Sequence, residues 1–359
     1  MLKKLYVVHK WAGLAVALLF LGQATTGMML AFKDELRALD RSGAFRVAAE
    51  GQRADLDSIV GAVKRHAPGW RLERLIAPVG ETQVFLARLV SENRQRRFLT
   101  IDPYTLAPTA FGGYAAFPLE AALFFHDNLL LGPVGRVIVG LQGILLLAMT
   151  VTGLVLWWPR GGLFLKSLKI AWTAPYPRLI FDLHRVPAAF ASVLLMVLAF
   201  TGAMISFRAE LTALLPAPPA LASGASVAGT AVSIEDARNR AAAAVGNAPL
   251  KDIRFSAQEP HVVRFVFHVD KTLNPRDAHQ VWADLERGGV TKIYPAKART
   301  AKDRFFDWML PIHTLEFLGM TGRIVAFLLG PTLIAMTVTG FLLWLKRQRV
   351  RARRKVPAA

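Results

Sequence analysis

Four of the eight histidines occupy matching positions in the two halves of the chain, each inside or just before a long apolar segment. One sequence offset pairs His126 with His313, and a second, slightly shorter offset pairs His9 with His184. When a membrane protein contains two equivalent halves, corresponding side chains face a common axis. We therefore expect His9 to meet His184 and His126 to meet His313, at two depths in the membrane. Two imidazoles that face each other are the axial ligands that an iron porphyrin needs.

Small residues, threonines and arginines repeat around these histidines with the same offsets. The repeats pair Gly132 with Gly319, Arg136 with Arg323, MTVTG at 149–153 with MTVTG at 336–340, and Thr26-Gly27 with Thr201-Gly202. The spacing from His9 to Gly27 is a whole number of helical turns, so the two residues share one helix face. Small residues on such a face admit either a neighbouring helix or a flat cofactor, and the sequence leaves both open.

Four apolar segments are long enough to cross a bilayer as helices, which takes about 20 residues. They lie near 5–32, 134–158, 180–207 and 322–345 in a chain of 359 residues, of which 53% are hydrophobic. Backbone polar groups cannot face lipid unpaired, so these segments must be helical. The predicted fold class is an α-helical membrane protein with an α+β extracytoplasmic part. It consists of a four-helix transmembrane bundle from an internal duplication and two small outer modules.

The distribution of basic residues orients these spans. Residues 1–4, 159–179 and the tail from 346 together hold thirteen lysines and arginines and no acidic residue. Such short basic stretches stay in the cytoplasm. We therefore expect a multi-pass protein of the bacterial inner membrane, with both termini in the cytoplasm and two modules in the periplasm. The net charge of +19 does not indicate nucleic-acid binding, because topology and the anionic headgroups of the lipid bilayer account for juxtamembrane cations.

The two outer segments have similar patterns. Each begins with a helix and continues with three strands in which polar and apolar residues alternate. The helices lie near 54–66 and 233–245, and the strands near 72–77, 83–90, 96–102, 251–256, 261–269 and 279–285. Each module alone has a small core, so we expect the two to pack together or onto the spans. Residues 216–231, rich in Pro, Ala, Gly and Ser, are typical of a flexible linker.

These segments predict the domain organisation. The boundaries are 1–33 (first span), 34–117 (first periplasmic module), 118–158 (outer helix and second span), 159–179 (cytoplasmic loop), 180–207 (third span), 208–305 (second periplasmic module), 306–345 (outer helix and fourth span) and 346–359 (basic cytoplasmic tail).

The residue types narrow the choice of cofactor. The chain has no cysteine, which excludes iron–sulfur clusters and covalently attached c-type haem. Zinc usually takes three or four protein ligands, and no acidic residue repeats beside the histidines. Two histidines per site therefore favour two non-covalent haem b groups, one on His9 and His184 and one on His126 and His313. Arg136 and Arg323 either hold the propionates or extend to the lipid headgroups.

These motifs resemble the PepSY-associated transmembrane (PepSY_TM) family of iron-regulated inner-membrane proteins, which includes siderophore-iron reductases of the ferrioxamine B type. The resemblance rests on HKWAGL at 9–14, DLHRVPA at 182–188, HDNLLLGPVGR at 126–136 and HTLEFLGMTGR at 313–323. It covers essentially the whole chain. It implies PepSY-like periplasmic modules, the four histidines as axial ligands of two haems, and reduction of a ferric siderophore in the periplasm. Some relatives carry a fused flavin domain; here we expect a separate electron donor, a quinol or a cytoplasmic reductase.

Two other functions stay open. A siderophore or iron permease component would also arrange repeated helices around an axis, although four spans are few and we expect no buried acidic residue within them. A non-redox PepSY regulatory membrane protein would bind a peptidase or a peptide and would not need matched histidines. The visible spectrum of the purified protein separates these functions.

Overall fold

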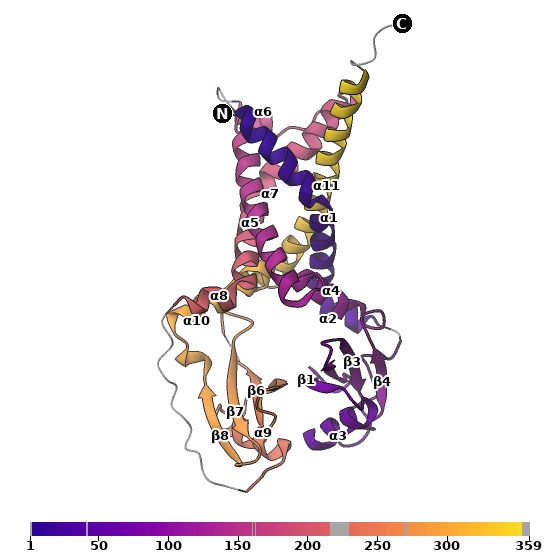
Figure 1. The fold of residues 1–359 in the computed structure, drawn as a ribbon, viewed down its shortest axis with the longest axis vertical. Helices are drawn as coiled ribbons and strands as arrows, with labels where there is room; N and C mark the ends of the chain where they lie inside the picture. The colour runs from indigo at the N-terminus through magenta and orange to yellow at the C-terminus, as the bar shows by residue number, and fades with distance from the viewer. Residues whose placement is uncertain are drawn as a thin grey trace. The chain divides into compact units, whose positions relative to one another are not determined.

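Four long apolar helices dominate one unit of this computed structural model, which describes residues 2–40, 42–159, 161, 163–215, 230–269 and 272–353. They are α1 (Leu2–Ala31), α5 (Gly132–Trp157), α7 (Tyr176–Ser206) and α11 (Gly319–Arg353), drawn in Figure 1. All four are long and apolar enough to cross a membrane, which confirms the predicted spans. Each begins a few residues before the predicted segment, because hydropathy marks the part in lipid and the helix continues beyond it.

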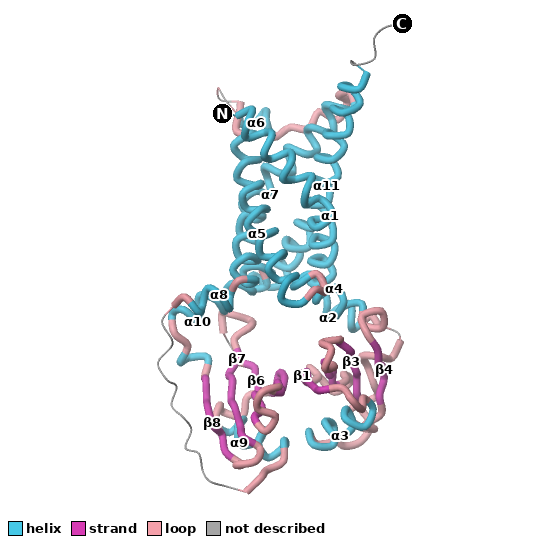
Figure 2. Tube along the Cα trace, in the orientation of Figure 1, coloured by secondary structure: helices cyan, strands magenta, loops and turns pink. Residues whose placement is uncertain are grey.

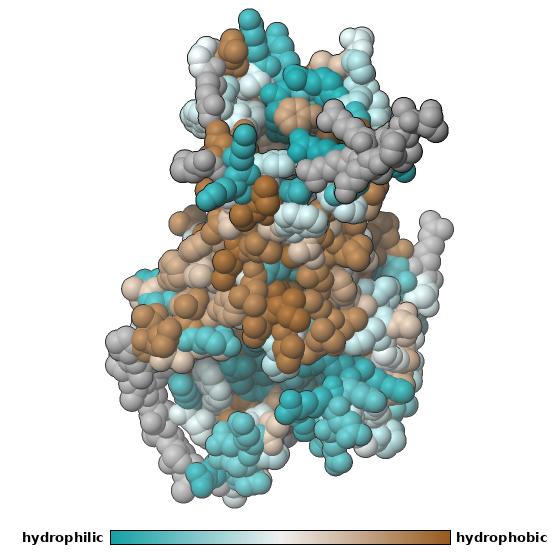
Figure 3. All heavy atoms as spheres, turned by 45° about the horizontal axis from the view of Figure 1, so that its top comes forward, coloured by the Kyte–Doolittle hydropathy of each residue, from teal (hydrophilic) through white to brown (hydrophobic). Residues whose placement is uncertain are grey.

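This unit, called the bundle unit below, comprises 1–32, 122–214 and 308–359. Helix α1 packs against α5 and α11, and α7 packs against the same two helices, so α1 and α7 lie diagonally opposite. Figure 2 shows the four helices running along one another, and Figure 3 shows a continuous apolar surface on the face of the bundle in view. The first residues of α1 and α7 lie at the same end of the bundle as the last residues of α5 and α11.

Short helices complete the connections of the bundle. They are α4 (Pro118–Asn128), α6 (Phe164–Ser167), α8 (Arg208–Ala213), α10 (Ala301–Thr314) and a 3-10 turn at Glu316–Leu318. The basic tail lies outside the described residues from 354 onward.

One buried acidic residue contradicts the expectation that the spans hold none. Asp182, in the second turn of α7, is fully buried. Its carboxylate accepts hydrogen bonds from Arg178 at 3.2 Å and Arg185 at 2.9 Å, and from the backbone N–H of Ala171 at 3.3 Å. A buried carboxylate held by two guanidinium groups is a structural ion pair. It fixes the start of α7 against the preceding loop.

The second unit, called the sheet unit below, comprises 33–121 and 215–307 and contains an eight-stranded antiparallel sheet. The strands are β1 (Arg71–Ile76), β2 (Phe85–Val90), β3 (Arg96–Ile101), β4 (Pro108–Gly112), β5 (Leu250–Phe255), β6 (Val262–His268), β7 (Ala278–Asp284) and β8 (Gly289–Tyr294). The helices are α2 (Lys33–Ala38), α3 (Leu56–His66), α9 (Ile234–Ala243) and a 3-10 turn at Ala296–Ala298.

The strand order is β4-β3-β2-β1-β5-β6-β7-β8, so each segment contributes four adjacent strands rather than the predicted three. The sequence reading missed β4 and β8, which form the two edges of the sheet. Edge strands carry weak alternation, and β4 begins with a proline that only an edge or a strand end accepts. The two halves join where β1 pairs with β5, with Leu75 opposite Ile253. The two predicted small sheets are therefore one.

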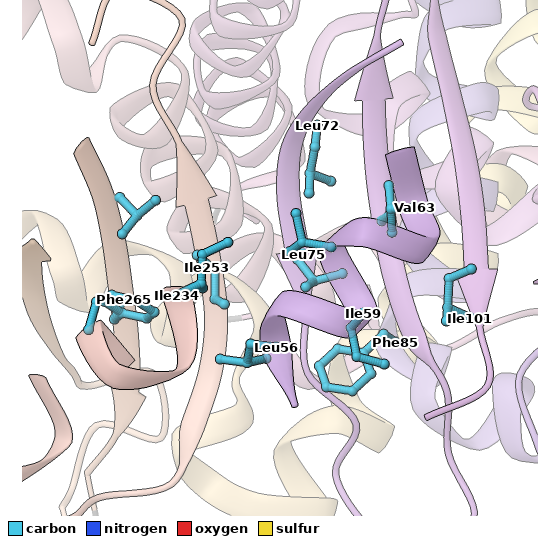
Figure 4. Packing of buried hydrophobic residues seen from close by; sticks show 14 of the residues in the cluster. Leu56, Ile59, Val63, Leu72, Leu75, Phe85, Ile101, Ile234, Ile253 and Phe265 are labelled. Carbon is cyan, nitrogen blue, oxygen red and sulfur yellow. The ribbon is translucent and has the colours of Figure 1, made fainter. Parts of the chain in front are cut away.

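Helices α3 and α9 cover one face of this sheet and form its core. Figure 4 shows Leu56, Ile59 and Val63 of α3 among Leu75, Phe85 and Ile101 of strands β1 to β3, with Ile234, Ile253 and Phe265 continuing the cluster. Burial of such side chains contributes about 1.5–3 kcal/mol each. The sheet unit therefore has one core that crosses the junction of the two segments.

The first turns of α3 and α9 are capped by side chains. Asp55 and Ser233 are the N-cap residues, and the Ser233 hydroxyl accepts from the N–H of Asp236. In addition, Glu235 of α9 accepts from the N–H of Leu56, and Asp57 of α3 accepts from the N–H of Ile234. Carboxylates stabilise a helix N-terminus because the free N–H groups and the helix dipole attract them. Each helix thus caps the other. The predicted linker lies outside the described residues over 216–229.

Candidate functional site

The inner pair, His9 and His184, lies on α1 and α7, in the third turn of each helix. A Cβ at Gly153 of α5 would meet His9 Cε1 at 3.1 Å, and one at Gly340 of α11 would meet His184 Cε1 at 3.2 Å. Each imidazole therefore lies against a glycine of the neighbouring helix. The two side chains are near enough to interact electrostatically; that they bind one common ion stays a prediction.

The outer pair, His126 and His313, lies on α4 and α10, the helices that precede the second and fourth spans. Here the receiving glycines are Gly27 of α1 and Gly202 of α7, each 3.1 Å from the histidine Cε1 by the same measure. The two imidazole ring centres are 6.1 Å apart and their planes are inclined by 58°. The repeated glycines of the sequence thus make room for imidazoles.

All four imidazoles have the same hydrogen-bonding environment. Each Nδ1 contacts a backbone carbonyl four residues before the receiving glycine and the hydroxyl of the threonine just before it. The contacts are Gln23 O and Thr26 Oγ1 for His126 (both 3.1 Å), Leu198 O (3.0 Å) and Thr201 Oγ1 (3.2 Å) for His313, Met336 O (2.9 Å) and Thr339 Oγ1 (3.2 Å) for His184, and the backbone of Met149 and Thr152 Oγ1 (3.0 Å) for His9.

These contacts determine which nitrogen carries the proton. A carbonyl oxygen can only accept a hydrogen bond, so Nδ1 must be the N–H donor. The threonine hydroxyls donate to carbonyls of their own helix, as Thr26 does to Gly22 at 2.7 Å, so their oxygens also accept from Nδ1. In a neutral imidazole this leaves the lone pair on Nε2. A histidine whose Nδ1–H is held in this way is oriented to bind a metal through Nε2.

The outer histidines depend on a turn that the chain builds twice. Gly132 and Gly319 start α5 and α11 with positive φ angles of 61° and 63°, which favour glycine. A Cβ at Gly135 would lie 1.7 Å from the carbonyl oxygen of Asn128, and one at Gly322 would lie 1.8 Å from that of Leu315. The spacing H-x5-G-x2-G-R in the sequence therefore encodes a sharp reversal between the short outer helix and the span.

The two predicted arginines contact protein groups and differ from each other. Arg136 is half exposed, and its Nη2 lies 3.5 Å from Asp127. Arg323 donates two hydrogen bonds to the carbonyl of Ala31, at 2.9 and 2.7 Å, and lies over the ring of Phe32. Arg323 therefore ties the last residue of α1 to α11. Neither contact tests whether the arginines also reach a propionate, which stays a prediction.

Further polar groups near the histidines have no partner in the structure. The indole Nε1 atoms of Trp157 and Trp344 are buried without a hydrogen bond, as is the amide Nε2 of Gln23. Trp157 and Trp344 each lie four residues after a receiving glycine, hence one turn further along the same face. Their repeat is visible in the sequence, but only the structure shows the missing partners. Buried donors without partners cost free energy, and a bound group that accepted their hydrogen bonds would offset that cost.

The donor set fits a metal held between two imidazoles. If each nitrogen–metal bond is about 2 Å, as in zinc sites, two rings on opposite sides of one ion have centres roughly 6 Å apart. The outer pair has this separation. Among the described residues, no group of three His, Cys, Asp or Glu side chains converges as a metal site, so a closed zinc site does not fit. Two histidines on opposite sides fit an iron porphyrin, with apolar helices around it.

Comparison with known proteins agrees with the motifs of the sequence. The comparison with curated proteins finds no match. The model of the PepSY-associated TM region matches residues 6–347, which cover nearly all of the four spans, the four paired histidines and both segments of the sheet unit. Because the match covers nearly the whole chain, the protein belongs to the family of the PepSY-associated TM region.

Proposed function

We propose that this chain is a membrane oxidoreductase that passes electrons from the cytoplasmic side of the bacterial inner membrane to a ferric siderophore in the periplasm. The observation that carries the proposal is one imidazole setting built four times: Nδ1–H donates to a helix carbonyl, and Nε2 is left as a ligand. The repeated setting also supports an internal duplication of the bundle. Two sites at two depths suit transfer across a membrane, whereas a single site would not.

We assign two haem b groups to these sites, one to His9 and His184 and one to His126 and His313. Bound haem b would supply reversible one-electron chemistry at these sites, and the paired imidazoles of this chain would hold its iron. The buried indole N–H groups of Trp157 and Trp344 are suitable donors to the polar edge of the inner group. Half-exposed Arg136 is the better of the two arginines for a propionate, because Arg323 already donates to Ala31.

The overall reaction balances as one electron per iron. An electron from a quinol or a separate cytoplasmic reductase converts Fe(III) in the siderophore to Fe(II). Hard oxygen ligands such as those of siderophores hold the more highly charged ion more strongly, so reduction loosens the complex and frees the metal. The protein contributes the fixed imidazoles, an apolar surrounding and a docking surface outside the membrane, with both chain termini on the cytoplasmic side.

The test is the haem content and visible spectrum of the purified protein and of His126→Ala. We expect about two haems per chain, with sharp absorption bands after dithionite reduction. His126→Ala should lose one haem and all reduction of ferric siderophore in vesicles that carry the donor inside. His66→Ala is the matched control, because His66 is exposed at the end of α3 in the sheet unit. This variant should keep two haems and the full rate of ferric siderophore reduction.

Two results would overturn the proposal. A His126→Ala variant with both haems would show that this residue is not a ligand. A colourless wild-type protein that does not take up added haem would favour the permease or the regulatory function instead.

A further inference from the structure

A row of cations crosses the face of the sheet opposite to α3 and α9. The strand registers place Arg88 opposite Arg74, Arg74 opposite Arg254, and Arg254 opposite Arg264. The row continues with Trp282 opposite Arg264 and Lys292 opposite Trp282. Directly opposed residues point to the same face, so one line across β2, β1, β5, β6, β7 and β8 presents four guanidinium groups and an ammonium group. This set is called the arginine row below.

The row lies on the face away from the core. In β5 and β6, Ile253, Val263 and Phe265 alternate with the row residues and are fully buried in the core cluster. Arg254 keeps 41% and Arg74 27% of its side-chain surface exposed, and Lys292 is exposed. Arg74, Arg254 and Lys292 therefore reach the surface, whereas Arg88, at 14% exposed, is mostly buried beside Glu120.

The acidic partners of the row do not balance its charge. Buried Asp252 accepts from Arg74 at 2.6 Å and from Arg254 at 2.8 Å, and buried Glu120 lies 2.8 Å from Arg88. Among the residues that the structure describes, these two carboxylates are the acidic groups paired with the row's five cations, and Glu120 is shared with Arg37. Like charges directly opposite each other destabilise a sheet. A row of this kind is costly unless an anion from outside binds there.

Arg264 lies at the centre of the part of the arginine row where cations outnumber carboxylates. Its guanidinium lies over the ring of Trp282, with the ammonium of Lys292 also over that ring, and its Nη1 donates to the Gln280 side chain at 3.4 Å. Burial first, and then the neighbouring Arg254 charge, lower the pKa of Arg264, and Asp252 only partly offsets this. By contrast, burial raises the pKa of Asp252, but Arg74 and Arg254 outweigh it and bring that pKa below its ordinary value. Asp252 is therefore fully charged and committed to its two arginines.

The spacing of the row indicates what kind of anion it fits. Neighbouring strands lie about 4.8 Å apart, so the distance from Arg88 to Arg264 is roughly 14 Å. This is longer than one carboxylate or phosphate can span. Guanidinium groups bind carboxylates through paired hydrogen bonds, and the flat Trp282 ring adds an apolar surface. The row therefore fits a small molecule with several separated carboxylates.

We propose that the arginine row binds the carboxylates of an anionic ferric chelate and so selects carboxylate-bearing siderophores over uncharged ones. This inference rests on the proposed function, because it names the substrate class for the same reaction. It does not depend on which donor supplies the electron.

The test measures binding separately from reduction. Full-length protein in nanodiscs of neutral lipid is dialysed against ferric citrate and, as the uncharged comparison, a neutral ferric trihydroxamate, and bound iron is counted. Because charge-assisted hydrogen bonds contribute about 1.5–3 kcal/mol, Arg264→Gln should weaken ferric citrate binding by about tenfold or more. The neutral chelate should change little. Raising the salt concentration should weaken only citrate binding.

Controls separate a binding effect from a folding effect. Arg65→Gln removes an exposed arginine of α3, outside the row, and should leave both affinities unchanged. If Arg264→Gln fails to fold, Lys292→Gln at the exposed end of the row carries the same expectation. Equal affinity for both chelates, or unchanged citrate binding in a folded row variant, would refute the inference. Haem content is measured on the same samples. Normal haem content without charge selectivity would refute this inference and leave the proposed function intact. Charge selectivity without haem would refute the proposed function and leave the binding role of the arginine row intact.

Discussion

The inner and outer histidine pairs receive the same contacts from different backbones. His9 and His184 lie within uninterrupted spans, whereas His126 and His313 lie on short helices that reverse into α5 and α11. Even so, each Nδ1 lies 3.0–3.2 Å from a threonine hydroxyl, and each Cε1 lies against a glycine. The histidine is carried by a span in one pair and by a short helix in the other. The receiving element is in every case a span that presents the same kind of threonine and glycine.

This difference shows what determines the position of the imidazoles. A stretch of helix with an accessible carbonyl, a threonine and a glycine forms the receiving surface, and any nearby backbone can supply the ring. The outer pair additionally needs its turn, where Leu129, Leu130 and Leu315 have positive φ angles between 53° and 62°. Such conformations are unfavourable for leucine. We therefore expect backbone changes to damage the outer site before the inner one.

The largest effect is expected from Gly135→Ala. The new Cβ would lie 1.7 Å from the carbonyl oxygen of Asn128, and backbone cannot yield as a flexible side chain can. The turn must open, and α4 with His126 must move. If the proposed function holds, the haem content should fall from two to one per chain while the spectrum of the inner site persists.

The control for this variant is Gly113→Ala, because a Cβ at Gly113 has nothing within 4 Å and should change neither haem content nor thermal stability. Loss of both haems at once in Gly135→Ala would mean that the two sites are not independent. Retention of both in a folded protein would mean that the turn does not position His126.

The sequence predicted the histidine pairs and the spans because both leave strong periodic signals. Constant offsets between the two halves identify equivalent histidines, and long apolar stretches identify helices in lipid. The predicted hydropathy segments omitted the polar residues at the helix starts. The burial of Asp182 was not predicted either, because burial is a property of tertiary packing and cannot be read from the neighbouring sequence. The helix starts and the burial of Asp182 depend on tertiary packing, which amino-acid composition does not specify.

The sheet was less predictable than the bundle. Edge strands β4 and β8 were missed, and the pairing of β1 with β5 joins segments from different halves of the chain. Pairing between distant strands is not encoded in local alternation. The arginine row was invisible for the same reason, because Arg74, Arg254 and Arg264 become neighbours only through strand register.

A smaller effect, restricted to the inner site, is expected from Trp157→Phe combined with Trp344→Phe. Both indole N–H groups are buried without partners. If they donate to the bound group, their loss should shift the inner redox potential and leave the outer one unchanged. If they donate to nothing, removing two unsatisfied donors should raise thermal stability, since each costs about 1–3 kcal/mol.

Redox titration followed by visible spectroscopy measures the first effect, and thermal unfolding measures the second. Trp308→Phe is the matched control, because Trp308 packs against Phe317 of the 3-10 turn before α11 and its indole is not among the unpartnered groups. An unchanged potential with increased stability would remove the two tryptophans from the site. A shift of the outer potential would contradict the independence of the two pairs.

The smallest effect is expected from Thr26→Val, which changes one acceptor and no shape. The Thr26 hydroxyl oxygen lies 3.1 Å from His126 Nδ1, and the carbonyl of Gln23 lies at the same distance. Valine removes the first acceptor and leaves the second, so Nδ1 keeps its proton and Nε2 stays a ligand. Because loss of a complete outer-shell partner costs about 10–100-fold in metal affinity, this partial loss should cost less than about tenfold. Thr152→Val makes the same change beside His9, where the hydroxyl lies at 3.0 Å, and haem titration of the apoprotein should show losses of similar size. A much larger loss at the outer site would mean that the receiving helix is not equivalent at the two depths and that the turn, rather than the carbonyl and threonine, holds the outer imidazole.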